Sequence, residues 1–451
     1  MAQIAQLQPQ IQLLQQQVRD LQQQLKQNSR NSSKPPSSDY FKQKRRRPPS
    51  DRKPGGQPGH SGHHRQRLPP GRIDHLQHYI PQSCRFCQNA LPQQQRPCDP
   101  PPRWHQVMEV PPLAATVTEH QAHGRLCSCC GKITFAAIPD SIRKHAFGAR
   151  LSGLINYLSA RCHNGKRLIQ EILADVFGVP IALGSVAARE REMQAALHRP
   201  YAQAQRHLRQ APVKNLDETS WASGGNPCWL WVAATQQAAL YRIHRRRSRK
   251  VLRRLLGARQ IGTIITDRHG AYSHWPALHR QICWAHLKRD FQYWKDGGVA
   301  LGTKGLSICK DLFALWRDFA QGKLDRPQLQ QSIQSVQTRL RRLLMWWSEH
   351  RNREPCGFAT HLLSCWESLW TFGRQEAVEP TNNHAERMLR PAVLWRKNSF
   401  GSQSRGGCIF TERILTTVAT LRLQGRNVLD YLCQCLNSHR ACKRVPKLIL
   451  R

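Results

Sequence analysis

The hydrophobic residues at the start of the chain repeat with a period of seven. Branched residues occupy one position of each heptad and leucines lie three places further on: Ile4, Ile11, Val18 and Leu25, then Leu7, Leu14 and Leu21. This pattern favours a parallel two-stranded coiled coil, which begins near Pro9 because proline breaks a helix interior. We predict a dimerisation helix over residues 1–27. A disordered Gln-rich segment is the alternative, since about three heptads is the lower limit for such a pattern.

Helical spacing returns further along the chain. Apolar residues recur three and four places apart over residues 151–158 and 168–176, as expected for helices packed on one face. A Gly-Val-Pro turn and Ser185, expected to cap the next helix, precede a third helix that carries Arg189 and Arg191. The order is that of a helix-turn-helix DNA-binding motif, and a plain helical hairpin explains it equally well.

Strand-like patterns replace helical ones after residue 210. The predicted elements are three short strands, a basic helix and a buried strand, in the order Val213–Asp217, Trp229–Thr235, Ala239–His244, Ser248–Gly257 and Gly262–Asp267. This order indicates an α/β domain. Residues 300–375 are helical again and rich in tryptophan, which indicates an inserted all-helical segment.

The strongly positive net charge of the chain indicates that the protein binds a polyanionic partner. The chain has 69 Lys and Arg against 28 Asp and Glu, a formal net charge of +41, far from what solubility alone favours. A Ser-, Pro- and Gly-rich linker follows the heptads, and between Lys42 and Lys53 it holds seven basic residues and one acid. Such a segment can hold a phosphate backbone without reading bases. No apolar run suggests a membrane span or signal peptide, so a cytoplasmic protein is expected.

Two Cys-x-x-Cys pairs stand out among sixteen thinly spread cysteines, Cys84 with Cys87 and Cys127 with Cys130. Zinc favours four thiolates in a tetrahedron, and each pair can supply two of them. We predict a Zn²⁺ site in a zinc-ribbon-like domain, with Cys129 as a competing ligand. Ordinary scattered cysteines are the alternative, because the interval between the pairs is longer than in common zinc fingers. The ribbon's strands are expected near Trp104–Val110 and Leu113–Glu119.

Two scarce carboxylates, Asp217 and Asp267, end predicted apolar strands. A buried unpaired carboxylate is costly unless it is paired or binds a cation. Carboxylates on rigid elements suit Mg²⁺ or Mn²⁺, and two such ions can stabilise the attacking and leaving oxygens of an in-line displacement. Glu386, early in a helix that Asn382 or Asn383 can cap, is the expected third ligand. Taken singly, each acid would more often be a strand-end cap, an ion pair or a helix-surface residue.

Several motifs spread over nearly the whole chain share one family pattern. In order they are NSSKPPSSD, GGQPGH, the Cys-x-x-Cys pairs with VTEH at Val117–His120, LDET at Leu216–Thr219, CWAH at Cys283–His286 and PTNNHAERMLRPAVLWRKNSFGS at Pro380–Ser402. With these motifs the chain resembles the bacterial insertion-sequence sixty-six family of transposases. The last motif is long and specific, whereas LDET alone is weak evidence.

The resemblance implies a DDE transposase with an RNase H-like α/β core, in which Asp217, Asp267 and Glu386 are the catalytic, Mg²⁺-binding triad. The 119 residues between the last two acids leave room for the helical insertion. Such enzymes cleave DNA at the element ends with water and then join the freed 3′-hydroxyl to target DNA, without a covalent protein–DNA intermediate. Companion reading frames usually accompany the family.

The expected partner is double-stranded DNA, at the terminal repeats of the element and at the target site. The basic residues expected to contact it are Arg45, Arg46, Arg47, Arg189, Arg191, Arg245, Arg246, Arg247, Arg387, Arg390, Arg396 and Lys397. Arg387 or Arg390 could hold a scissile phosphate, although solvent-facing helix positions are commoner. His286 orients DNA or a metal-bound water, or is a packed core histidine. A homodimer or higher oligomer on DNA is expected, nucleoid-associated, with companion proteins and no membrane.

Two positions depart from the family pattern. Gln88 follows the first cysteine pair where glycine is usual, so a looser turn is expected there. Asp267 is followed by Arg268, His269 and Gly270, where an Asp-Gly-Tyr type of turn is common.

The predicted fold class is a multidomain chain, with an α/β RNase H-like core interrupted by an all-helical insertion. The segments are a coiled coil (1–27), a basic linker (28–75), a zinc-ribbon-like domain (76–140), a helical domain (145–200), the catalytic core (210–298 and 376–425), the insertion (299–375) and a basic C-terminal tail (426–451). Two other functions are weighed against transposition. One is a catalytically decayed zinc-containing DNA-binding protein that represses or inhibits at the element ends, and the other is a structure-selective nuclease that cuts without joining.

Overall fold

The computed structural model describes residues 66–450 except residue 352, with Gln10, Ile11, Leu14, Gln15, Val18, Gln27 and Asn31. The chain forms two compact units, Phe41–Leu113 and Met1–Tyr40 with Ala114–Arg451. The predicted coiled coil lies almost wholly outside the described residues, as do Arg45, Arg46 and Arg47. Ile11, Leu14 and Val18, the described members of the heptad, are helical and 51–59% exposed.

The unit Phe41–Leu113 has little regular structure in its described part, which contains a 3₁₀ turn over Pro70–Arg72 and a bridge between Ser83 and Ala90. The strand predicted near Trp104–Val110 is wrong. These residues pair with no described strand, and Val107 is 79% exposed. A strand needs both a ladder partner and a face to bury, and this segment has neither.

The second predicted ribbon strand, Leu113–Glu119, is wrong for the same reason. A short antiparallel hairpin lies further along the chain instead. Its strands are β1 (Gly124–Leu126) and β2 (Ile133–Phe135), which flank the second cysteine pair.

The helices expected after residue 145 are present. They are α2 (Asp140–Arg143), α3 (Ala149–Ala160), α4 (Lys166–Phe177), α5 (Leu183–Ala196) and α6 (His198–Gln210). Gly178 ends α4 with φ at 63°, a left-handed conformation that favours glycine. Helix α5 begins with Ala182 as its N-cap, so Ser185 lies in the first turn and is not the predicted cap. A small core of Ile155, Ile169, Leu173 and Val186 joins α3, α4 and α5.

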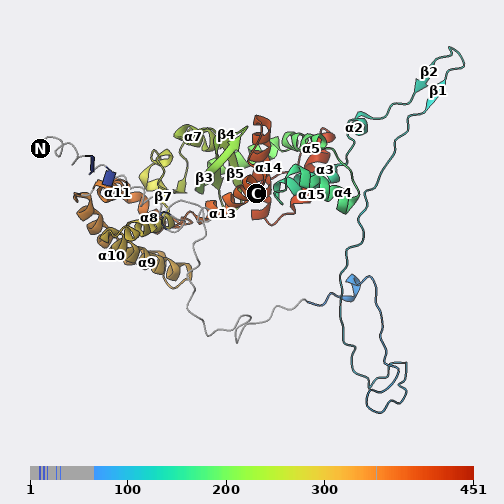
Figure 1. Ribbon diagram of the computed structural model, residues 1–451, viewed down its shortest axis with the longest axis horizontal. Coiled ribbons are helices and arrows are strands. Elements are labelled where there is room, and N and C mark those ends of the chain that lie inside the picture. The colour runs from blue at the N-terminus through green and yellow to red at the C-terminus, as the bar shows by residue number, and fades with distance from the viewer. Residues whose placement is uncertain are drawn as a thin grey trace. The chain divides into compact units, whose positions relative to one another are not determined.

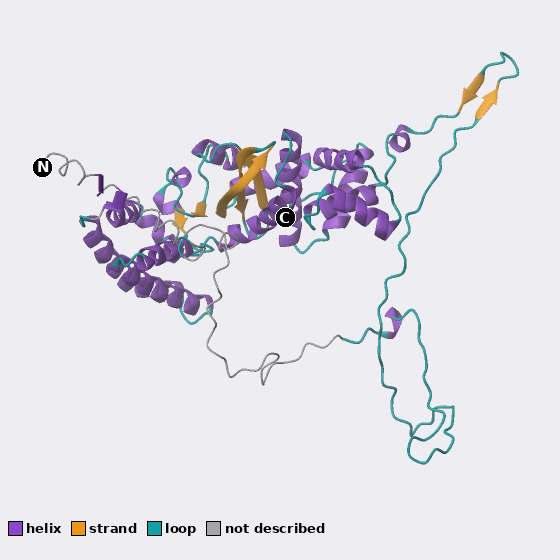
Figure 2. Ribbon diagram, in the orientation of Figure 1, coloured by secondary structure: helices purple, strands orange, loops and turns teal. Residues whose placement is uncertain are grey.

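A five-stranded mixed sheet follows, with the strand order β5-β4-β3-β6-β7. Figures 1 and 2 show the strands of this sheet with helices around them. Its strands are β3 (Val213–Ser223), β4 (Asn226–Ala234), β5 (Ala239–His244), β6 (Thr263–Thr266) and β7 (Arg280–Ile282). β3, β4 and β5 form an antiparallel meander, whereas β6 and β7 run parallel to β3 and to each other. Helix α7 (Arg249–Leu256) connects β5 to β6, as the sequence predicts.

The outer edge of β5 is covered by a helix. Outward N–H groups of Ala239 and Tyr241 donate to the hydroxyls of Thr420 and Thr416 at 3.1 and 3.0 Å, and Ile243 N–H donates to the Glu412 carboxylate at 2.8 Å. Acceptors four residues apart on a helix are about 6 Å apart, close to the two-residue repeat of a strand. Helix α14 (Arg405–Leu423) therefore accepts the hydrogen bonds of the outward N–H groups of β5. Without this helix, the edge of β5 would be free to pair with another strand.

An all-helical segment separates the last strand from helix α13 (Asn383–Ser399). It contains α9 (Ala300–Ala320), α10 (Arg326–Ser348), α11 (Arg353–Ser364) and α12 (Thr371–Arg374), and α8 (Trp284–Asp296) leads into it. Ile265 and Ile282 of the sheet share its hydrophobic core. The helices thus pack directly on the β6 and β7 side of the sheet.

In the structure, the first half of the predicted basic tail is a packed helix. Helix α15 (Val428–Arg440) buries Tyr431, Leu432 and Leu436 in the main core. Arg440 forms a two-pronged ion pair with Glu192 of α5, with its nearer contact at 2.7 Å. The C-terminal helix therefore fastens the helices before the sheet to those after it. Of the helices in the described part, none is long and apolar enough to cross a membrane.

Candidate active site

The two predicted aspartates lie on neighbouring parallel strands. Pairing of β3 with β6 runs to Asn215 and Ile265, and Asp217 and Asp267 each come two residues later. The prediction that Asp217 ends its strand is wrong. Strand β3 continues to Ser223, because it forms a hairpin with β4. Asp267 does follow its strand directly. The two carboxylates are thus at the same level of the sheet.

Of the three predicted acids, Asp217 has the fewest hydrogen bonds and ion pairs to offset the burial of its charge. It is half-buried, and its one hydrogen bond in the described structure is from the Glu218 N–H at 2.9 Å. Burial first, and then the negative charges of Glu218 and Asp267, raise the pKa of Asp217 well above its usual range, with a further contribution from Glu386. None of the described cationic side chains forms an ion pair with it. The position favours a proton or an added cation over a bare charge.

Sequence reasoning missed a fourth acid, Glu218, whose side chain is fully buried. Its carboxylate accepts from Arg247 Nε at 2.5 Å and from the Tyr272 hydroxyl. Burial and Asp267 raise the pKa of Glu218, while Arg247 and Tyr272 oppose this. The signal was present in LDET, since Glu218 is the next residue after Asp217. Because successive residues of a strand face opposite sides, the neighbouring position of Glu218 does not by itself place its carboxylate beside that of Asp217.

Asp267 is held by backbone and arginine contacts. Its Oδ1 accepts from the His269 N–H at 2.9 Å, and its Oδ2 lies 3.5 Å from Arg247 Nη2. The side chain of Asp267 keeps 20% exposure. Arg247 therefore bridges Glu218 and Asp267, and it also stacks over Trp229 at 4.8 Å.

Glu386 lies in the first turn of α13, whose start is tied to β3 beside Asp217. Asn382 stands at the N-cap position, but its side chain does not cap the helix. Its amide instead donates to Leu216 O at 2.7 Å and accepts from the Asn215 amide at 3.1 Å. These bonds fix the helix start against the strand that carries Asp217. Asn382 of the NNH sequence thus positions Glu386 through the backbone of the helix.

The Glu386 carboxylate contacts α8 on its other side. Its Oε1 accepts from Arg289 Nη2 at 3.1 Å and lies 3.7 Å from His286 Nε2. Burial and the charge of Arg289 lower the pKa of His286, so the imidazole is neutral at pH 7. One turn further along α8, half-buried Asp290 pairs with Arg268 at 2.8 Å. His286 of the CWAH motif thus faces Glu386, the third of the predicted acids.

The donor set of the site suits a hard divalent cation. Carboxylate oxygens on rigid elements are the ligands of Mg²⁺, and Asp217 has a pKa that is raised first by burial and then by the neighbouring acids Glu218 and Asp267. Within the described ranges, no three His, Cys, Asp or Glu side chains are gathered closely enough to hold a metal. Asp267 and Glu386 are turned toward arginines instead. The three acids fit a divalent cation in their chemistry and in the positions of their backbones. Arg247 and Arg289 balance the charges of Asp267 and Glu386.

Each cysteine pair forms a turn of the same design. Cys84 N–H donates to Asn89 O and Gln88 N–H to Cys84 O, and the second pair repeats both bonds one for one. Gln88 takes a φ of 59°, close to the 64° of Gly131 at the matching position. The looser first turn predicted from Gln88 is therefore wrong.

Backbone amides in these turns point at the first cysteine of each pair. Hydrogen bonds from Cys87 and Phe86 lower the pKa of the Cys84 thiol, and those from Cys130 and Cys129 lower the pKa of Cys127. A lowered thiol pKa favours the thiolate that binds metals. The two turns belong to different compact units, and each is shaped to present thiolates.

The described basic residues expected to contact DNA fall into two groups. Those with exposed side chains are Arg191, Arg245, Arg246, Arg387, Arg390 and Lys397. The others are engaged within the protein. Arg189 pairs with Glu192 at 3.0 Å, Arg247 pairs with Glu218, and Arg396 contacts Ser220. His384, next to Asn383, is buried against Thr235 O at 2.8 Å.

Comparison with known proteins identifies the family of the chain. Residues 147–408 match the Transposase IS66 family, and residues 1–66 match a family of unknown function (DUF6444). An uncharacterized protein of Sinorhizobium fredii, y4qI, is 30% identical over 166 residues, which make up 34% of this chain and 30% of that protein. The chain thus spans less than a third of that relative. The family match covers more than half of the chain and takes in the sheet, the helical insertion and all three acids, and the chain belongs to the Transposase IS66 family.

Proposed function

We propose that the protein is a DDE transposase, which binds the ends of its insertion sequence and catalyses Mg²⁺-dependent DNA cleavage and strand transfer. The observation that carries the proposal is the position of Asp217 and Asp267 at one level of two adjacent strands, with the start of α13 fastened beside them. The mixed sheet, with the acids on its central strands and on a covering helix, supports an RNase H-like core.

In this proposal Asp217, Asp267 and Glu386 hold Mg²⁺ or Mn²⁺. The bound ions supply Lewis-acid activation of the scissile phosphate and of the attacking oxygen. The chain's own part is positional, since β3, β6 and α13 fix the acids on rigid elements. Arg247 and Arg289 neutralise Asp267 and Glu386 in the metal-free protein. Exposed Arg387 and Arg390, on the same helix as Glu386, are placed to hold DNA phosphates.

The products of one reaction separate this function from its rivals. Labelled DNA that carries the element's own ends is incubated with the protein, Mg²⁺ and target DNA. A transposase gives nicks at the ends and joined products, while a structure-selective nuclease gives hydrolysis without joining. A repressor that has lost its chemistry binds the ends and cuts nothing. If only binding occurs, repeating the reaction with the companion proteins tests whether they are required.

We further propose that the two cysteine turns bind Zn²⁺ and support recognition of the DNA ends. The purified protein should contain zinc, and chelation should reduce binding to the ends more than Mg²⁺-dependent chemistry. Elemental analysis and end binding are compared for Cys127→Ser/Cys130→Ser and for Cys162→Ser, which removes an exposed thiol outside the turns. The first variant should lose zinc and end binding, and the second should keep both. A wild-type protein free of zinc would refute this assignment.

A further inference from the structure

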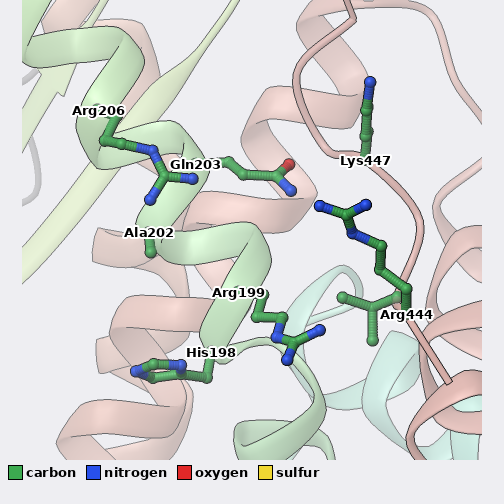
Figure 3. A pocket seen from close by; sticks show the side chains of 8 residues that line it. His198, Arg199, Ala202, Gln203, Arg206, Arg444 and Lys447 are labelled. Atoms are coloured by element: carbon green, nitrogen blue, oxygen red, sulfur yellow. The ribbon is translucent and has the colours of Figure 1, made fainter.

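A basic cavity lies away from the carboxylates, between α6 and the segment that follows α15 (Figure 3). This open cavity has a volume of about 720 Å³, within the usual range for ligand sites. Helix α6 lines one side with Arg199 and Arg206, and the C-terminal segment lines the other with Arg444 and Lys447. None of the residues that line it belongs to the triad or its ion pairs.

The charge of this cavity is uncompensated. All four cationic side chains are exposed, and none forms an ion pair with a described carboxylate. Helix α6 and residues 441–451 contain no Asp or Glu. Four like charges in a concave site raise the local potential for an anion well beyond what scattered surface lysines achieve.

The cavity is also held in shape. Arg426 donates to Leu448 O at 2.9 Å and to Lys447 O at 3.2 Å. Tyr431 donates its hydroxyl to Pro446 O at 3.0 Å, and the Leu448 N–H donates to the Gln203 side chain on α6 at 2.9 Å. Leu448 itself is fully buried. The backbone of the C-terminal segment is therefore a fixed wall of the cavity.

We propose that this cavity binds backbone phosphates of double-stranded DNA, as a contact separate from the catalytic carboxylates. The inference rests on the proposed function in that the chain acts on DNA. Arginine and lysine are the side chains that hold phosphates without reading bases. Ala202 and Val445 are the apolar residues of the lining, which offers no large hydrophobic side chain for a lipid. A duplex held here is anchored by its backbone and positioned whatever its sequence.

The test measures how DNA binding depends on salt, using the full chain without Mg²⁺. Each lost phosphate contact lowers the slope of log K against log salt by about 0.9. Arg444→Gln/Lys447→Gln should therefore reduce the slope by about 2 between roughly 50 and 200 mM salt. The reduction should be equal for an element-end duplex and an unrelated duplex of the same length. Arg199→Gln/Arg206→Gln should behave alike from the opposite wall.

The matched control is Lys310→Gln/Arg342→Gln, which removes the same charge from exposed positions on α9 and α10. A slope that is unchanged in both cavity variants, or that falls equally in the control, would overturn the proposal. Because DNA binding is measured without cleavage, the proposal about the cavity and the proposed transposase chemistry can be refuted independently of each other. A protein that cuts DNA with unchanged slopes refutes the cavity alone, and one that shows the slope change yet never cuts refutes the chemistry alone.

Discussion

Replacing Asp217 by Asn should abolish Mg²⁺-dependent DNA cleavage and at the same time stabilise the metal-free protein. A carboxylate ligand contributes several kcal/mol to stabilising the transition state through its ion, so the rate should fall by about a thousandfold or more. The amide keeps the bond from the Glu218 N–H and removes a charge that burial and neighbouring acids oppose. Stability should rise by roughly 0.5–2 kcal/mol, the range of favourable single substitutions.

The pH dependence of this gain follows from the sign of the shift. The pKa of Asp217 is raised in the folded protein, so folding is favoured by its protonated form and loses stability as the pH rises through the folded value. The stability advantage of Asp217→Asn over wild type should therefore grow as the pH rises and narrow toward about pH 4, near the pKa of an unfolded aspartate. Thermal melts of Asp318→Asn, an exposed acid, serve as the control. A variant that is less stable and fails to bind DNA would mean that Asp217 is structural.

Replacing Arg247 by Met should cost about 3 kcal/mol of unfolding free energy. The change leaves Glu218 fully buried without its cation, while the methionine keeps much of the apolar stem over Trp229. Arg247 is itself 28% exposed, and solvent screening therefore keeps the cost at the lower end for a buried pair. The penalty should grow with pH, because the pKa of Glu218 is already raised and its protonated form needs no partner.

A double-mutant cycle separates this pair from a general loss of packing. Glu218→Gln in the Arg247→Met background should recover much of the stability, since no buried charge is then left unpaired. Arg339→Met, which breaks an exposed pair with Asp311, should cost at most about 1 kcal/mol in the same urea denaturation. If Arg247→Met lowered the free energy of unfolding no more than Arg339→Met does, the pair of Arg247 with Glu218 would not contribute to stability as proposed.

Much of the sheet could be predicted because its strands carry their signals locally. Ala239–His244 agrees in both bounds, and the predicted helix over Ser248–Gly257 differs from α7 by one residue at each end. β7 was missed because Arg280 and Gln281, two of its three residues, are polar. Their burial depends on partners far along the chain, such as Thr371 and Leu369. No local pattern reports such contacts.

The sequence predicts which residues form the candidate site, and it says less about how they are arranged. The scarcity of acids and the family motifs pointed to Asp217, Asp267 and Glu386. The role of Asn382 could not be foreseen, because a residue before a helix is expected to cap it, and here its side chain bonds β3. The C-terminal helix could have been predicted from the helical spacing of Tyr431, Leu432, Cys435 and Leu436. The prediction of a tail gave weight to the basic composition of this segment instead.

The most direct test of the proposed chemistry compares wild type, Glu386→Gln and Glu376→Gln on labelled DNA carrying the element's ends, with Mg²⁺ and target DNA. Glu376 is an exposed acid ten residues before Glu386, and its replacement controls for the loss of one charge. We expect nicked and joined products from wild type and Glu376→Gln, and none from Glu386→Gln although it still binds the ends. Joined products from Glu386→Gln at the wild-type rate would contradict the proposal that Glu386 completes a catalytic triad.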